Sequence, residues 1–551
     1  MMKVKKDTIN AAILLVFFTL MLWIGIGSYY DFRISHESPF GYGASDSYQY
    51  QVRIEGIKEV GNYRYEQPYV VRGYEDVNGF YPPGMYHLAL GLSYAGGLEA
   101  YDMILFLPFF MTALASLLIF LIINRHSRKI AILSLPITIL LFSEKAFVAY
   151  TFASWASVIA QLFILAAIFA LDNIDKRNMY ILFGIFVSAV MMFHTSEGIF
   201  FALFMVLYLI VMLLQKRLDK DLIIKIVKAA IISIILCAYF LVIFQLTWSK
   251  ATPPHFGTST TNWGNTPIFY LTDFKIALAF IIAGMAISLF FIYKGKFTVP
   301  IILGFSMIIL AYGNYIGFTF RSFQLRFFWP AYLAIFAGIA IYFVLKYITK
   351  NDIAYYGVAA LLAILFFGLI NLSLIPSAVK VDNSGSSDPL RWEVLTYFRN
   401  NTDPKATVYF VYNDVYGQKA ILRNTERIHY ITIGKYYIGS LINGTLERYQ
   451  YIEQPGDGGN GMAYRTGVFE FKSHYEDEPK PVFDKYMDIC SFDYIVIDKV
   501  NYIGDRQATI ASSEYNKKFA ETLLKHSQMK IVFQNDLSVI IKNNNPGEAC
   551  V

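Results

Sequence analysis

Long runs of apolar residues recur through the first two thirds of this chain, and they restrict its fold more than any other feature. A helix that crosses a bilayer needs about 20 mostly apolar residues, and fewer where neighbouring helices shelter its ends. Of all 551 residues, 56% are hydrophobic and only 16% are charged. We therefore expect a polytopic α-helical membrane protein with eleven spans, at 9–30, 103–123, 130–142, 153–171, 179–193, 199–214, 226–248, 274–293, 297–312, 328–345 and 353–375.

Basic residues fall in alternate loops between these segments. Lys and Arg precede the first segment and then occur within 125–129, 176–177, 216–225, 294–296 and 346–350. With eleven spans, all of these loops lie on one side, which the positive-inside rule identifies as the cytoplasm. No small-residue cleavage site follows the first segment, so we interpret it as a retained helix. We expect a multi-pass plasma-membrane protein with a cytoplasmic N-terminus and an extracytoplasmic C-terminal domain.

The last third of the chain has the composition of a soluble domain. A linker rich in turn-forming residues, 382–389, separates it from the last span. The predicted domains are therefore a membrane domain at 1–378, with a large first outer loop at 31–101, and an extracytoplasmic α/β domain at 379–551. Within the α/β domain the pattern predicts helices at 391–400 and 515–525 and strands at 407–412, 492–498 and 529–533. Cys490 and Cys550 could form a disulfide only if this domain is exported and oxidised.

The distribution of charge excludes several classes of function. The net charge of +6 is spread over many short loops, and no basic tract with interleaved aromatic residues occurs, so we expect no nucleic-acid binding. Inside the predicted spans the main polar interruptions are Gln161 and Gln245. Ion-coupled transporters usually need ionisable groups at membrane depth, and their near absence disfavours a pump or symporter.

The predicted outer loops, by contrast, gather acids and bases. Asp46 follows a Gly/Ser-rich turn at a place suited either to a helix N-cap or to a carboxylate directed at a ligand. A single Lys or Arg at a span end usually extends its charge to the lipid headgroups. The acids and bases of the outer loops taken together, however, suit a reaction of an anionic lipid-linked substrate. Arginine binds phosphate bidentately, and a carboxylate can act as a base or hold a metal. The residues are Asp46, Glu75, Asp76, His87, Glu144, Lys145, His194, Glu197, Lys250, His255, Arg321 and Arg326.

Three short elements carry a family resemblance. Asp46 in the first outer loop, followed by FYPPGMYHLAL at 80–90, resembles the GT-C superfamily of membrane glycosyltransferases, which includes protein O-mannosyltransferases, aminoarabinose transferases and oligosaccharyltransferase catalytic subunits. QLRFFWP at 324–330 is similar to a late element of that group, with Gln324 where an acid is frequent, and Glu144 falls where several members have a second acid. Residues 391–417 resemble the start of an oligosaccharyltransferase soluble domain but lack both tryptophans of its acceptor-binding signature, so we assign no subfamily.

The resemblance implies an inverting glycosyltransferase that moves a sugar from a polyprenyl-phosphate donor to an extracytoplasmic lipid, glycan or protein. It makes Asp46 the base, while Arg326, or else Arg321, binds the donor phosphate. Glu144 would support the base or hold Mg²⁺ or Mn²⁺ with Asp46. The acceptor side of the cavity would contain His194, Glu197 and His87. Two alternatives stay open: a transporter or flippase of lipid-linked saccharides, and a non-catalytic membrane scaffold whose exported domain binds a partner.

Overall fold

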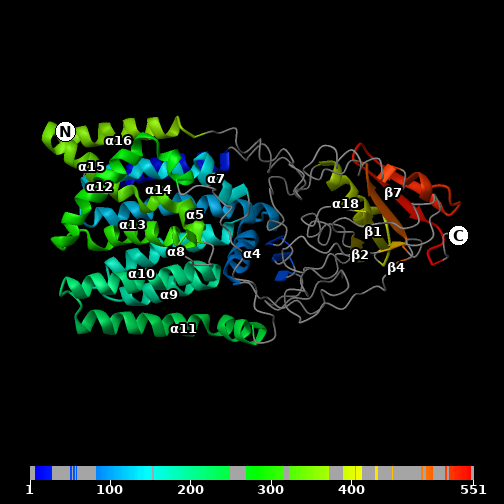
Figure 1. Ribbon diagram of the computed structural model, residues 1–551, viewed down its shortest axis with the longest axis horizontal. Helices are drawn as coiled ribbons and strands as arrows, with labels where there is room; N and C mark the ends of the chain where they lie inside the picture. Colours follow the sequence, from blue (N-terminus) through cyan, green and yellow to red (C-terminus); the bar gives the residue numbers. More distant parts are fainter. Residues whose placement is uncertain are drawn as a thin grey trace. The chain divides into compact units, whose positions relative to one another are not determined.

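The chain divides into two compact units, one made of helices and one built around a sheet. The computed structural model, drawn in Figure 1, describes residues 6–27, 50–51, 54–55, 57–58, 82–151, 154–248, 268–315, 322–370, 389–403, 405–411, 428–431, 449–450, 486–487, 492–499, 516–517 and 520–547.

The helical unit contains most of the predicted spans. Eight of its described helices are long and apolar enough to cross a membrane, and Met179–Phe193 and Asp352–Phe367 are shorter apolar helices. This confirms a multi-span membrane fold, while the count of eleven stays a prediction. Its elements are α1 (Lys6–Leu22), η1 (Trp23–Gly27), α4 (Gly84–Gly96), α5 (Ala100–Asn124), α6 (Arg128–Ser134), η2 (Leu135–Phe142), α7 (Glu144–Thr151), α8 (Trp155–Asp172), α9 (Met179–Phe193), α10 (Thr195–Leu214), α11 (Lys220–Trp248), η4 (Phe269–Phe274), α12 (Ile276–Tyr293), α13 (Thr298–Ala311), η5 (Gly313–Tyr315), η6 (Ser322–Phe328), α14 (Trp329–Tyr332), α15 (Ala334–Ile348) and α16 (Asp352–Phe367).

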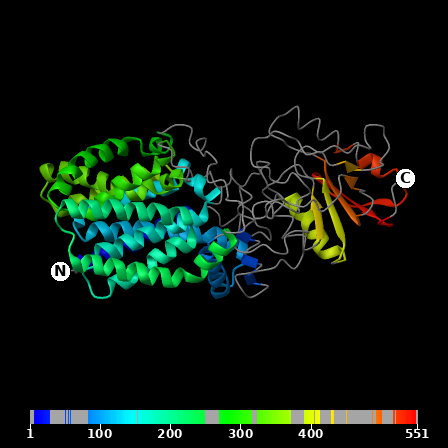
Figure 2. The same cartoon turned by 60° about the horizontal axis from the view of Figure 1, so that its bottom comes forward.

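Burial separates a central helix from those at the rim. In α8, 89% of the span is buried inside the protein, whereas the share is 22% for the spans of α1, α11 and α12. The long helices run side by side in both views, and α11 lies along one edge of the bundle in Figure 1 (Figures 1 and 2). Side chains of α11 such as Ile231, Ile234 and Ile235 are exposed in the bundle, as expected for a surface that faces lipid.

The third predicted span, 130–142, changes its helix type part of the way along. Residues Arg128–Ser134 form α6, and the chain then tightens into the 3₁₀ helix η2, which begins next to Pro136. Proline has no N–H and its ring clashes with the preceding turn of an α-helix, which explains why α6 ends there. Every residue of η2 is buried. The tighter winding gives more length per residue, so this short segment extends further than an α-helix of equal size.

Close contacts join the basic loops at one end of the helical unit. Arg125, after α5, pairs with Asp175 before α9 at 3.0 Å, and Lys129 pairs with Asp352 at the start of α16 at 2.7 Å. Arg217, after α10, donates to the carbonyl oxygen of Gly295 between α12 and α13 at 3.1 Å. These contacts confirm that the basic loops share one end of the unit. That this end faces the cytoplasm stays a prediction.

The second unit is an α/β domain, as predicted. Its main sheet has the order β2-β1-β5-β7-β6, with β1 parallel to β2 and β5 and with β7 antiparallel to β5 and β6. Helix α18 buries Leu395 and Phe398 in a core with Val408, Val496 and Ile540. The elements are α18 (Pro389–Asn401), β1 (Thr407–Val411), β2 (Ile428–Ile431), β5 (Tyr494–Asp498), β6 (Met529–Gln534) and β7 (Ser538–Asn543), with β3 (Tyr449–Gln450) and β4 (Tyr486–Met487) in a small second sheet.

The strands predicted at 407–412, 492–498 and 529–533 are confirmed as β1, β5 and β6. The described residues 516–517 and 520–523 are helical, which agrees with the helix predicted at 515–525. Strands β2 and β7 were not predicted. Lys542 and the flanking asparagines make β7 look like a polar surface segment, although five of its six residues are buried. The domain boundaries at residues 378 and 379 stay a prediction.

Candidate functional site

The candidate site is built around an arginine that lies inside the helical unit. Arg326 belongs to the 3₁₀ helix η6, all of whose residues are buried, and only 1% of Arg326 is exposed. Its Nε and Nη2 donate to the carbonyl oxygen of Ala311 at 3.1 and 2.9 Å, and Nη2 also donates to Oδ1 of Asn314 at 2.7 Å. Both acceptors are neutral. No carboxylate forms an ion pair with Arg326 among the described residues.

Aromatic rings take the place of a carboxylate around this guanidinium. A cation placed over an aromatic face is attracted by the negative charge density of the ring, and the attraction is stronger where water is excluded. Burial raises the pKa of the Tyr270 phenol to about 12, against the opposing effect of Arg326, so the phenol stays neutral. Four ring centroids lie within reach of the Arg326 Cζ: Tyr312 at 5.0 Å, Tyr315 at 5.3 Å, Trp329 at 5.9 Å and Tyr270 at 6.0 Å.

Three buried polar atoms of this region have no hydrogen-bond partner among the described residues. Two are donors, Nη1 of Arg326 and Nδ2 of Asn314, and the third is the acceptor Oε1 of Gln324. A buried donor without an acceptor costs about 1–3 kcal/mol, and more if it is charged. Because Arg326 and Asn314 are hydrogen-bonded to each other, their unsatisfied donors belong to one small region. An anion with several acceptor oxygens would satisfy both.

Hydrogen bonds from the central helix fix the position of η6. Nε2 of Gln161, in α8, donates to the carbonyl oxygen of Gln324 at 3.0 Å. Oε1 of Gln161 accepts from the hydroxyl of Tyr332, in α14, at 3.3 Å. One buried glutamine side chain therefore ties α8 both to η6 and to the short helix that follows it. Gln161 is 0% exposed, so no water competes for these bonds.

The same glutamine connects the arginine region to a buried carboxylate. Glu197, in the first turn of α10, is 0% exposed. Its Oε1 accepts from the Ser157 hydroxyl at 2.5 Å, and Nε2 of Gln161 reaches that hydroxyl oxygen at 3.2 Å. Its Oε2 is paired with Nδ1 of His194, which lies between α9 and α10. The structure thus brings two predicted site residues, His194 and Glu197, into direct contact.

Glu144 and His87 lie on helices next to this region. Glu144 is exposed at the start of α7, which packs against both η6 and η4. There the backbone N–H of Lys145 donates to a carboxylate that was not predicted, Asp273 of η4, at 2.8 Å. His87 is exposed on α4, which packs against α5 and α9. Figure 1 shows α4 and α7 at the same end of the bundle.

The remaining predicted site residues, Asp46 and Arg321, lie outside the described residues. The same is true of four other residues of the predicted outer loops, Glu75, Asp76, Lys250 and His255, and of the cysteines Cys490 and Cys550. Among the described residues, no three His, Cys, Asp or Glu side chains are close enough to share a metal ion. The predicted Mg²⁺ or Mn²⁺ site, Asp46 with Glu144, therefore stays a prediction.

Sequence reasoning missed the groups that hold Arg326. Ala311 and Asn314 are 15 and 12 residues from Arg326, and the aromatic residues look like ordinary span-end tyrosines and tryptophan. One signal was available, because Gln161 interrupts an otherwise apolar span. A buried glutamine needs partners, and it finds one of them 163 residues away in sequence.

No family model matches this sequence, and no curated protein matches it either. Solved structures do match. An oligosaccharyltransferase from Archaeoglobus fulgidus in the apo form has a TM-score of 0.58 and 13% identity, covering 98% of this chain and 75% of that chain. ArnT from Cupriavidus metallidurans, bound to undecaprenyl phosphate, has a TM-score of 0.55 and 11% identity, covering 98% of both chains. The arabinofuranosyltransferase AftD from Mycobacteria has a TM-score of 0.54 and 10% identity, covering 97% of this chain and 40% of that chain.

Proposed function

We propose that this chain, which has the fold of the GT-C superfamily, transfers a sugar from a polyprenyl-phosphate donor to an extracytoplasmic acceptor. The observation that carries the proposal is Arg326, a buried cation without a carboxylate partner among the described residues, in a chain that matches three membrane transferases over almost its whole length. One of those transferases was solved with undecaprenyl phosphate. These structures favour transfer over the transport and scaffold alternatives.

Arg326 is proposed to bind the donor phosphate. Its Nη1 and the Asn314 Nδ2 are buried donors with no partner among the described residues, which suits phosphate oxygens. The aromatic rings lower the local dielectric, which strengthens the attraction between a guanidinium and the charge that develops on a leaving phosphate. Arg321 is the second candidate for this role. The three unpaired atoms also include an acceptor, Gln324 Oε1, which a sugar hydroxyl could satisfy.

In the proposed reaction, Asp46 takes a proton from the acceptor nucleophile. The nucleophile forms a bond to the anomeric carbon while the bond from that carbon to the phosphate oxygen breaks, and the lipid phosphate leaves with its electron pair. Attack opposite the leaving group inverts the anomeric centre. Glu144 would support the base or, with Asp46, hold Mg²⁺ or Mn²⁺. His194, Glu197 and His87 would shape the acceptor side, and the exported domain at 379–551 would select the acceptor.

Incubation of purified full-length protein with radiolabelled polyprenyl-phosphate sugars and a membrane extract tests this proposal. Wild-type protein should form a labelled product, and Asp46→Asn should lower the rate at least about 100-fold, since a general base contributes roughly 10²–10⁴-fold. Glu66→Gln, in the same loop, is the matched control and should retain the rate.

Two results would contradict the proposal. Equal activity of the Asp46→Asn and wild-type proteins would remove Asp46 from the role of base. Movement of intact labelled donor across the membrane of proteoliposomes, with no labelled product, would indicate a transporter and not a transferase.

A further inference from the structure

A second polar site lies at the opposite end of the helical unit, among the basic loops. A cavity of about 900 Å³ is lined there by the ends of α8, α10 and α11 and by the turn between α12 and α13. This volume is within the range of about 300–1,000 Å³ typical of ligand sites. It is independent of the Arg326 region and of the proposed reaction.

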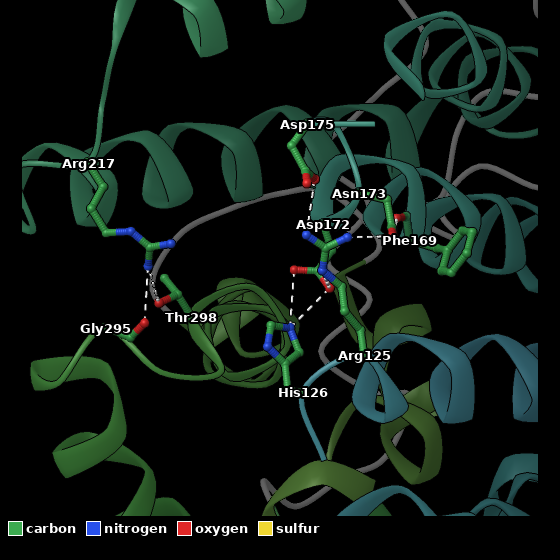
Figure 3. A network of polar contacts seen from close by, with 9 residues as sticks. All are labelled: Arg125, His126, Phe169, Asp172, Asn173, Asp175, Arg217, Gly295 and Thr298. Carbon is green, nitrogen blue, oxygen red and sulfur yellow. Dashed lines mark hydrogen bonds and ion pairs between the residues drawn. The ribbon is translucent and has the colours of Figure 1, made fainter. Parts of the chain in front are cut away.

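Most charged side chains in this cavity already have a charged partner. His126 Nε2 lies 3.0 Å from Asp172 Oδ2, and Arg125 Nε lies 3.5 Å from the same oxygen. Arg125 also binds Asn173 and Asp175 (Figure 3). Lys225 pairs with Asp221 at 2.6 Å. The fourth acid of the cavity, Asp219, accepts from the backbone N–H of Leu222 at 2.8 Å and so caps the start of α11.

Two cations of the lining have no acidic partner among the described residues, Arg217 and Lys296. Arg217 is held by neutral groups, because its Nη1 donates to the carbonyl oxygen of Gly295 at 3.1 Å and to the Thr298 hydroxyl at 3.2 Å. Figure 3 shows its other terminal nitrogen directed away from these acceptors. Lys296 is exposed in the same turn. The lining as a whole has four Lys or Arg side chains and four Asp side chains, so its charge is balanced, and Arg217 and Lys296 are its two cations outside the ion pairs of the described residues.

Apolar side chains also line part of this mainly polar cavity. Met212 of α10, Leu222 of α11 and Val299 of α13 contribute to the lining. Helix α11 has Ile223 and Val227 exposed near this end, where lipid would cover them. A ligand that suits this part of the cavity thus carries an anionic group for Arg217 and Lys296 and an apolar part for Met212, Leu222 and Val299.

We propose that this cavity binds a phosphate group through Arg217 and Lys296, and that the phosphodiester of an anionic phospholipid in the adjacent leaflet is the source it suits. Basic pockets between membrane helices are common lipid headgroup sites, and arginine matches the geometry of phosphate oxygens. The lipid would hold α11 against the bundle, because both cations lie in the loops that flank α10, α11 and α12.

Titration of the detergent-solubilised full-length protein with fluorescent phosphatidylglycerol in mixed micelles tests this inference. The Arg217→Gln/Lys296→Gln double variant should bind at least about tenfold more weakly than wild type, a loss of about 1.4 kcal/mol, because it removes both charged donors. The matched control is Lys294→Gln, since Lys294 lies two residues away over Phe290 and Tyr293 and outside the cavity lining. Arg217→Lys, which keeps the charge, separates phosphate geometry from charge alone.

Competition identifies the source of the phosphate. Unlabelled phosphatidylglycerol should displace the probe, and phosphatidylcholine, which has no net charge, should displace it less well. Displacement by millimolar inorganic phosphate, lost in the double variant, would support the phosphate site with a soluble ligand as its source. Equal weakening by Lys294→Gln, or undiminished binding by the double variant, would overturn the proposal. Melting temperatures of the lipid-free proteins, if equal, show that the variants fold.

Discussion

Two arginines at opposite ends of the helical unit have different surroundings. Arg125 contacts the carboxylates of Asp172 and Asp175, and 30% of its side chain is exposed. Arg326 contacts a backbone carbonyl, an asparagine and aromatic rings, and it is 1% exposed. The charge of Arg125 is compensated within the protein, whereas among the described residues the charge of Arg326 meets only dipoles and aromatic rings.

This contrast distinguishes an arginine that stabilises the fold from one that is available for a ligand. An arginine paired with carboxylates gains little from an added anion, which the same carboxylates would repel. A buried arginine held by neutral groups carries a desolvation cost that an anion can offset. Arg217 also has neutral acceptors, but it is exposed and so does not carry this desolvation cost.

Replacement of Arg326 or Arg125 by methionine should give the largest difference in effect between the two ends. Arg326→Met is expected to lower sugar transfer at least about 100-fold, as for loss of a donor that stabilises transition-state charge. Arg125→Met is expected to act mainly on stability, lowering the free energy of unfolding by about 1–3 kcal/mol because Asp172 loses a partner. Initial transfer rates and thermal melting of purified protein measure the two effects. A larger loss of sugar transfer in Arg125→Met than in Arg326→Met would contradict the assignment of the donor site to the end that contains Arg326.

A smaller effect is expected where η6 is anchored. Gln161→Leu removes the bonds to the Gln324 carbonyl and the Tyr332 hydroxyl, so η6 should hold Arg326 less accurately. We expect about a tenfold rise in KM for the donor. Thr138→Val is the control, because Thr138 is buried and bonds only locally, to the Leu135 carbonyl at 2.7 Å. The anchoring role would be ruled out if both variants lost stability equally and neither changed KM.

At the basic end, the expected effects are on stability alone. Asp172→Asn keeps the shape of a side chain that is only 5% exposed but weakens its contacts with Arg125 and His126. The free energy of unfolding should fall by about 1–2 kcal/mol. This cost should shrink at high salt, because salt screens the wild-type contacts of Asp172 that the variant weakens. Denaturation in detergent at two salt concentrations measures this. A cost that grows with salt would contradict an electrostatic origin.

The smallest effect is a dependence on pH. Burial raises the pKa of Asp175, but its hydrogen bond and ion pair with Arg125 outweigh this and hold the pKa below the ordinary value of 3.8. A lowered pKa stabilises the fold above the unfolded value, and this contribution is lost as the pH falls through the folded value. Because the carboxylate is 69% exposed, the effect should be small. Melting curves of wild type and Asp175→Asn should differ at pH 7 and converge as the pH falls well below the ordinary value of 3.8. A gap that widens in acid would refute this.

Much of the architecture follows from one-dimensional patterns. The length of the apolar segments identified the spans of the helical unit, and runs of β-branched and aromatic residues identified β1, β5 and β6. The charge pattern placed the basic loops at one end, and contacts such as Arg125 with Asp175 agree. Strand β7 was not predicted, because its polar residues do not indicate that it is buried.

The chemistry of the site depends on three-dimensional pairing that the sequence does not encode locally. Arg326 was singled out from its motif, but its neutral partners depend on how η5 returns to η6. Ser157 and Tyr332 could not be connected to Glu197 and Gln161 without knowing which faces of α8, α10 and α14 meet. Residue type limits the chemistry that a group can perform, and packing decides which groups perform it together.

A close contact between two helices of the bundle, α12 and α15, has a mechanical consequence. A Cβ on Gly284 of α12 would lie 1.8 Å from the carbonyl oxygen of Phe336 in α15, so the two backbones touch directly. Helices that interlock so closely resist sliding past each other, and α12 and α15 should move as a single rigid block. Any opening of this bundle therefore has to occur at another seam between its helices.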